Sequence, residues 1–235
     1  EARRRPGELT YASFGIGSMF SFSSEGPAYF SASPINRSRI APTILAEGLD
    51  NACRSEDAGS ENQTGAATCQ LAQAQGTSFS APNVAGAAAL IREYFDQGFY
   101  NNKPTKAISS RLVRALLFAS ATPITSGKVF IPPDRFNNVW GYGQVQLTRV
   151  LPLAEFPETV TGLIVHDLPP ADINGDGSLD GVSDLSFPGT INGGQTLTAD
   201  FTVNGVTDDL AVALVWDDSL GAAGETGVLN DNMNL

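Results

Sequence analysis

Residues 76–98 read GTSFSAPNVAGAAALIREYFDQG, and this stretch decides the fold class. The run from Val84 to Ile91 is apolar or small on every side, which is typical of a fully buried helix rather than of a strand. Pro82 is tolerated near the start of such a helix, and Gly98 is a natural C-terminal stop. The Gly-, Ser- and Asn-rich stretch at 48–75 predicts a long polar loop before the helix.

A second helix is predicted from Ser109 to Ala121. Apolar residues recur there at helical spacing and form one face. They are Ile108, Leu112, Val113, Leu116 and Leu117. Either Ser109 or Ser110 can cap the helix, because a serine oxygen accepts a hydrogen bond from an early backbone N–H.

The last third of the chain has a different texture. Residues 197–203 alternate apolar and polar side chains, which predicts a half-buried strand, and residues 210–216 read as a second strand. We therefore expect an all-β domain, a sandwich or a jelly roll, over residues 154–235. Residues 1–153 would form an α/β domain, so the predicted fold class is α/β followed by all-β.

Charge and hydropathy exclude some partners. The 235 residues include 25 acidic and 14 basic ones, which give a net charge of -11. Nucleic-acid binding needs a basic surface, so we expect no nucleic-acid partner. No apolar run approaches the roughly 20 residues that span a bilayer, so we expect no membrane segment.

The two cysteines, Cys53 and Cys69, lie 16 positions apart within the polar stretch. A disulfide between them would stabilise the loop by about 3 kcal/mol in the chain-entropy model. Such a bond suits an oxidising compartment and therefore a secreted protein. The alternative is a pair of free surface thiols.

Ser78 stands where the polar stretch meets the helix, in Gly76-Thr77-Ser78-Phe79-Ser80-Ala81-Pro82. A helix N-terminus offers unpaired N–H groups and partial positive charge, which can hold an oxyanion formed when a serine attacks a carbonyl. Gly76 allows close approach of a substrate backbone. The plainer interpretation is that Ser78 only caps the helix.

The segment GTSFSAPNVAG, followed by AALI, resembles the nucleophile segment of subtilases, the subtilisin-like serine proteases. Arg39–Gly48 is similar to the strand before it, and Trp140–Gly143 to the closing segment of the catalytic domain. Residues 214–218 and 229–235 resemble the C-terminal β-domain of large secreted subtilases. The resemblance implies a secreted serine endopeptidase that hydrolyses peptide or protein substrates through an acyl-enzyme on Ser78.

A subtilase triad runs in chain order Asp, His, Ser, yet Ser78 lies too close to Glu1 to leave room for the other two. The only histidine, His166, lies downstream. We therefore expect the catalytic Asp and His, and the oxyanion-binding Asn, in an upstream half of the catalytic domain that precedes Glu1. The chain alone should be an inactive fragment. Phe79 stands where the family often has an oxidisable Met.

Two other functions remain open. An α/β-hydrolase-type esterase uses the chain order Ser, acid, His, so His166 would be its base. Its G-x-S-x-G elbow would need Gly where Ser80 stands, and it would need a strand before Ser78. The second alternative is a non-catalytic secreted β-rich binding module.

A calcium loop is the one metal site that the sequence suggests. Residues 172–180 read DINGDGSLD, which resembles the first nine positions of an EF-hand loop, with Gly at the sixth. The expected ligands are the side chains of Asp172, Asn174, Asp176 and Asp180 and the carbonyl of Ser178. Position twelve is Ser183 rather than Glu, so binding should be weak unless Asp184 replaces it. A solvated acidic turn is the alternative.

Overall fold

The computed structural model describes residues 19–20, 22–26, 28–29, 38–39, 41–53, 71–102, 108–124, 136–156, 162–167, 182–183, 195–200, 202 and 210–216. The chain divides into two compact units. Unit 1 comprises Glu1–Ala87 and Ala121–Val145, and unit 2 comprises Ala88–Ser120 and Gln146–Leu235. The predicted calcium ligands, Asp184 and Cys69 lie outside the described residues.

The helix expected around Ser78 is α2, Thr77–Asp96. The helix ends at Asp96, and Gly98, the predicted stop, follows two residues later with a φ of 78°. The Gly98 amide donates to the Phe95 carbonyl and the Phe99 amide to the Tyr94 carbonyl, both at 3.1 Å. This pair of bonds is the Schellman arrangement, which places glycine in the left-handed region just after a helix.

The prediction that α2 is buried on all sides is wrong for the described residues. Only Ile91, Tyr94 and Phe95 are buried, all in the C-terminal half. A Cβ added at Gly86 would meet nothing within 4 Å, and Leu90 is 54% exposed. A helix that is apolar all round needs protein on every side, and the described part of the chain covers one side of its second half.

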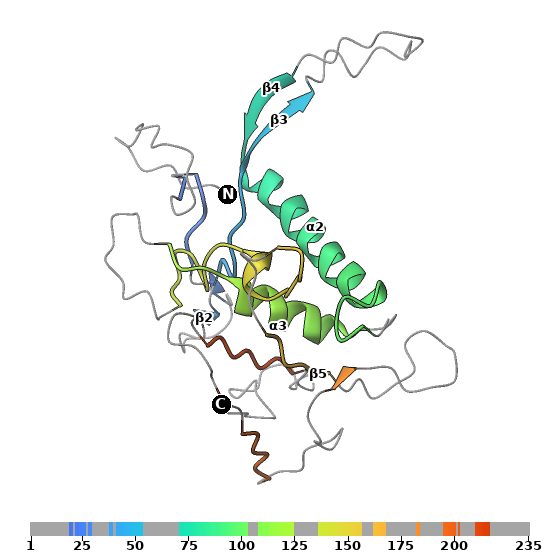
Figure 1. Cartoon of the computed structure of the whole chain (residues 1–235). Coiled ribbons are helices and arrows are strands. Elements are labelled where there is room, and N and C mark those ends of the chain that lie inside the picture. Colours follow the sequence, from blue (N-terminus) through green and yellow to red (C-terminus); the bar gives the residue numbers. More distant parts are fainter. Residues whose placement is uncertain are drawn as a thin grey trace, which may run out of the picture. The chain divides into compact units, whose positions relative to one another are not determined.

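The prediction of a polar loop over residues 48–75 is wrong at both ends of the segment, because these ends pair with each other as two strands. Strand β3, Leu49–Cys53, pairs antiparallel with β4, Leu71–Gln75. The register joins Leu49 to Gln75 and Cys53 to Leu71. Figure 1 shows β4 running directly into α2. The polar residues misled the prediction because ladder hydrogen bonds form between backbones and do not require β-branched side chains.

Three further segments of unit 1 lie side by side, with Gln144 in the middle. Gln144 bridges Leu45 in parallel and Thr122 antiparallel. The Leu45 amide donates to the Gly143 carbonyl at 2.8 Å, and the Val145 amide donates to the Leu45 carbonyl at 2.9 Å. A separate short ladder pairs β1, Ala28–Tyr29, with β2, Ser38–Arg39.

The Trp140–Gly143 motif has a clear structural reason. Gly141 and Gly143 have φ values of 61° and 121°, a region that favours glycine. A Cβ on Gly141 would lie 2.1 Å from the Thr43 carbonyl oxygen, and one on Gly143 would lie 2.1 Å from that of Thr122. The two glycines therefore let the three segments approach closely. Trp140, the residue before Gly141, is buried.

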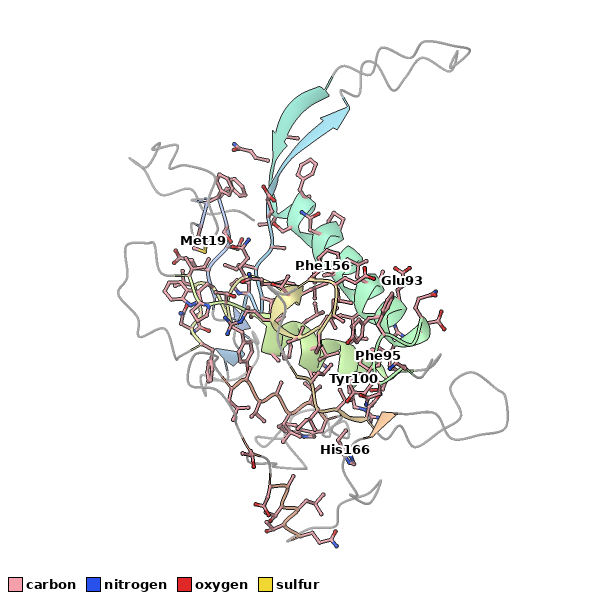
Figure 2. All side chains as sticks on the ribbon, in the orientation of Figure 1. Met19, Glu93, Phe95, Tyr100, Phe156 and His166 are labelled. Carbon is pink, nitrogen blue, oxygen red and sulfur yellow. The ribbon has the colours of Figure 1, made fainter. Side chains whose placement is uncertain are left out.

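Of the described buried apolar side chains, more belong to unit 2 than to unit 1. The predicted second helix is α3, Ser110–Ser120, and its expected apolar face is buried. The short helix η1, Leu147–Arg149, packs against α3. The centroids of the Phe95 and Tyr100 rings lie 5.0 Å apart. Both side chains are labelled in Figure 2. Among the residues that the structure describes, the buried apolar side chains of unit 2 are Ile91, Tyr94, Phe95, Tyr100, Ile108, Leu112, Val113, Leu116, Leu117, Val150, Leu151 and Val165.

A buried carboxylate fixes the start of α3. Asp167 accepts hydrogen bonds from the Ser109 amide at 2.7 Å and from the Ser109 hydroxyl at 2.6 Å. The Ser109 oxygen in turn accepts from the Leu112 amide at 3.1 Å. Ser109 is thus the N-cap, and Ser110 is the exposed first residue of the helix. A negative charge here also favours the helix dipole.

The C-terminal region does not show the all-β domain. Its only ladder among the described residues pairs β5, His166–Asp167, with β6, Val182–Ser183. Residues 195–200 alternate as predicted, with Leu197 and Ala199 half-buried and Thr198 and Asp200 exposed, but they are not assigned to a strand. Residues 210–216 are not assigned to one either. Alternating apolar and polar side chains indicate an extended segment with two different faces. A β-strand also needs backbone hydrogen bonds to a neighbouring strand. The domain boundary at 154 stays a prediction.

Within the described part of the chain, no helix is both long enough and apolar enough to cross a bilayer.

Candidate nucleophile site

Ser78 is the second residue of α2, and its side chain is exposed. It follows the sequence Gln75-Gly76-Thr77, where the ladder of β3 and β4 ends and the helix begins. Gly76 has a φ of 156°, which few residues other than glycine adopt. Its carbonyl accepts the Phe79 amide at 3.0 Å and so starts the helix. The arrangement is a tight strand–turn–helix junction with a serine at its exposed corner.

Two polar groups of Ser78 have no partner among the described residues. No hydrogen bond joins its amide or its hydroxyl to any of them. Pro82, four residues later, has no N–H and so leaves the Ser78 carbonyl without its helical donor. The helix N-terminus adds partial positive charge at the Ser78 amide. An unpaired amide in this field is suited to hold an oxygen anion beside the hydroxyl.

The junction is anchored to residues 47–48, a contact that the sequence did not predict. The Gly76 amide donates to the Gly48 carbonyl at 2.8 Å. The side-chain amide nitrogen Nδ2 of Asn83 donates to the Glu47 carbonyl at 3.0 Å. Consecutive carbonyls thus hold the chain on both sides of Ser78.

Gly48 allows this contact because it has no side chain. It is buried, and an added Cβ would lie 2.9 Å from Ser80 Oγ and 3.1 Å from the Gly76 carbonyl oxygen. A side chain at position 48 would therefore press on the backbone just before the nucleophile. In the sequence, the one signal for Gly48 is that it ends the segment Arg39–Gly48, which is similar to a strand of subtilases.

The unit that contains Ser78 offers no histidine base. Unit 1 contains no histidine, because His166, the only one in the chain, belongs to unit 2. His166 is half-buried in β5, and the carboxylate of its neighbour Asp167 holds Ser109. That acid is therefore already bound to a helix cap. The described part of the chain also has no group of three or more His, Cys, Asp or Glu side chains that could hold a metal.

One objection to the α/β-hydrolase alternative is removed, since a strand does precede Ser78. The other stands, because Ser80 occupies the position where the elbow needs glycine. No observation in the described residues favours either alternative function over the protease.

The sequence match to known families settles the class. The model of the subtilase family matches residues 14–143, more than half of the 235 residues. The chain therefore belongs to the subtilase family, and its fold class over that region is α/β. Subtilases are serine proteases, so this membership supports serine-protease function. No curated protein and no solved structure matches the chain.

Proposed function

We propose that this chain carries the nucleophile of a serine endopeptidase, Ser78, and that it acts together with an upstream part of the same catalytic domain. The observation that supports this most directly is the exposed Ser78 at the first turn of α2, within the region matched by the subtilase family. Its amide and hydroxyl are free of partners among the described residues.

The proposed chemistry follows from these groups. The Ser78 oxygen attacks the carbonyl carbon of the scissile peptide bond while a histidine base takes the hydroxyl proton. The carbonyl oxygen becomes an anion, and the Ser78 amide donates to it. The same histidine then protonates the leaving amine, the C–N bond breaks, and an acyl-enzyme forms on Ser78. Water releases the second product by the reverse sequence.

The base, its aspartate partner and a second oxyanion donor are proposed to come from the upstream part. A serine hydroxyl is a weak nucleophile until a base within about 3 Å removes its proton. Unit 1 has no histidine, so the proposed activity of residues 1–235 depends on that part.

The test compares Ser78→Ala with wild type in the full-length protease on a peptide substrate. We expect the variant to lose turnover by a factor of thousands or more. A fluorophosphonate probe should label wild type on the peptide that contains Ser78 and should not label the variant. Turnover that is unchanged in Ser78→Ala would refute the assignment.

A second arm tests the need for the upstream part. The 235-residue chain is assayed alone and after mixing with the upstream polypeptide, and we expect hydrolysis only from the mixture. Hydrolysis by the chain alone that disappears in His166→Ala would instead support the α/β-hydrolase alternative.

We also propose that the parent protease is secreted and that the loop at 172–184 binds Ca²⁺ weakly. The support for calcium is the sequence pattern of alternating oxygen ligands, and the support for secretion is the pair of cysteines, Cys53 and Cys69, 16 positions apart in the sequence.

A further inference from the structure

We propose that Asn83 is a positioning residue for Ser78, because its side chain fixes the first turns of α2 to the Glu47 carbonyl. The inference rests on the proposed role of Ser78 as nucleophile. It concerns a residue that makes no contact with the reacting atoms in the proposed mechanism.

The first step is the pair of attachments around the nucleophile. The Gly76 amide, two residues before Ser78, bonds to the Gly48 carbonyl at 2.8 Å. The Asn83 side chain, five residues after it, bonds to the Glu47 carbonyl at 3.0 Å. With one hydrogen bond, the start of the helix could rotate about that bond. Two hydrogen bonds, one before and one after Ser78 in the sequence, fix both the position and the orientation of the first turns of α2.

The second step is the direction of the contact. Ser80 Oγ is the side-chain atom that a Cβ on Gly48 would meet, so this side of the helix faces residues 47–48. Asn83 lies three residues further on and therefore occupies the same side. Ser78 lies about 160° away from Ser80 at 3.6 residues per turn. The contact therefore holds the back of the helix and leaves the Ser78 hydroxyl uncovered.

The third step is the rigidity of the support. The segment that carries Glu47 is itself bonded at Thr43 and Leu45: the Thr43 carbonyl accepts the Tyr142 amide at 2.8 Å, and Leu45 makes its two bonds to residues 143 and 145. Those glycine-dependent contacts admit no extra atoms at Gly141 or Gly143. Asn83 thus connects the nucleophile turn to a backbone segment that is itself held by hydrogen bonds to residues 142–145.

The experiment compares Asn83→Asp with Asn83→His in the full-length protease. Asp has nearly the same shape as Asn but, when ionised, has no hydrogen to donate. The His ring can place its Nδ1–H close to the position of the Asn amide, so it restores the donor. We expect Asn83→Asp to lower kcat about 10- to 100-fold, the scale of a misplaced reacting group, with KM within about 2-fold of wild type. Asn83→His should recover most of the loss.

Arg92→Ala is the matched control. Arg92 also donates from α2 to a backbone carbonyl, that of Ile108, at 3.3 Å. It lies 14 residues beyond Ser78, about 21 Å along the helix. This variant should lose stability without loss of kcat when it is assayed well below its melting temperature.

Labelling by a fluorophosphonate probe gives a second readout of the Ser78 oxygen alone, and its rate should fall in parallel with kcat. Equal kcat for Asn83→Asp and Arg92→Ala would overturn the proposal, and so would a loss that Asn83→His does not restore. If Asn83→Asp does not fold, Asn83→Ala replaces it in the test. Its kcat and its rate of fluorophosphonate labelling are then compared with those of Arg92→Ala in the same way. Full activity in Ser78→Ala would show instead that the proposed function has failed.

Discussion

Replacing Ser109 by alanine should destabilise unit 2 by more than the loss of a helix N-cap alone. The Ser109 hydroxyl has two roles, because it accepts from the Leu112 amide and donates to Asp167. Loss of a helix N-cap costs about 1 kcal/mol. Loss of a hydrogen bond to a charged group costs about 1.5–3 kcal/mol. Because Asp167 is only 4% exposed, water cannot readily replace the lost donor.

We therefore expect Ser109→Ala to lower the free energy of unfolding by about 3 kcal/mol, since the two effects share one oxygen and do not add fully. For a chain of this size the melting temperature should fall by about 6 to 12 °C. The measurement is urea unfolding followed by circular dichroism at 222 nm, with hydrogen exchange of the α3 peptides as a local readout.

Ser110→Ala is the control, because Ser110 is the next residue and is exposed. Its replacement should change stability by no more than about 0.5 kcal/mol. If the two variants unfold at the same urea concentration, the buried pairing of Ser109 with Asp167 does not stabilise the fold and the reasoning fails.

Two further predictions concern pH and calcium. Burial raises the pKa of Tyr94, whose hydroxyl donates to the Pro152 carbonyl at 2.8 Å. The folded state therefore keeps its proton where the unfolded state, with a tyrosine pKa near 10, has lost it, so stability should fall above about pH 10. Between pH 8 and pH 11 the urea midpoint of unfolding should fall less in Tyr94→Phe than in wild type. An equal fall in both would show that Tyr94 is not the cause of the lost stability. Calcium should raise the melting temperature of the full-length protein by mass action, and Asp176→Ala should abolish the rise. A rise of equal size in the variant would show that calcium binds elsewhere.

The helices were predictable because their signals are local. The apolar spacing of α3 and the Gly98 stop of α2 depend on residues within one or two turns of each other. The choice between Ser109 and Ser110 as cap was not local, because it depends on Asp167, 58 residues away. A capping preference identifies candidates, and only the fold supplies the buried acceptor.

The hairpin before Ser78 was missed for a related reason. Residues 72–75 alternate Ala and Gln, which is a weak strand signal, and β3 contains Asp50 and Asn51, which strands usually lack. The pairing is decided by five backbone matches across the hairpin, which sequence propensity does not report. Likewise Ser78 could be chosen from its segment, whereas the contact of Asn83 with a carbonyl 36 residues earlier could not.

The β3–β4 ladder also bears on how this region can be altered by evolution or by a protein engineer. Five paired positions fix the register between residue 53 and residue 71, and a change of register by one residue would invert every side chain of β4. The free energy of closing a loop rises only slowly with its length. Insertions between residues 53 and 71 should therefore leave Gly76 in place. An epitope or a fluorescent label inserted there should therefore leave the junction between β4 and α2, with Ser78 at its exposed corner, unchanged.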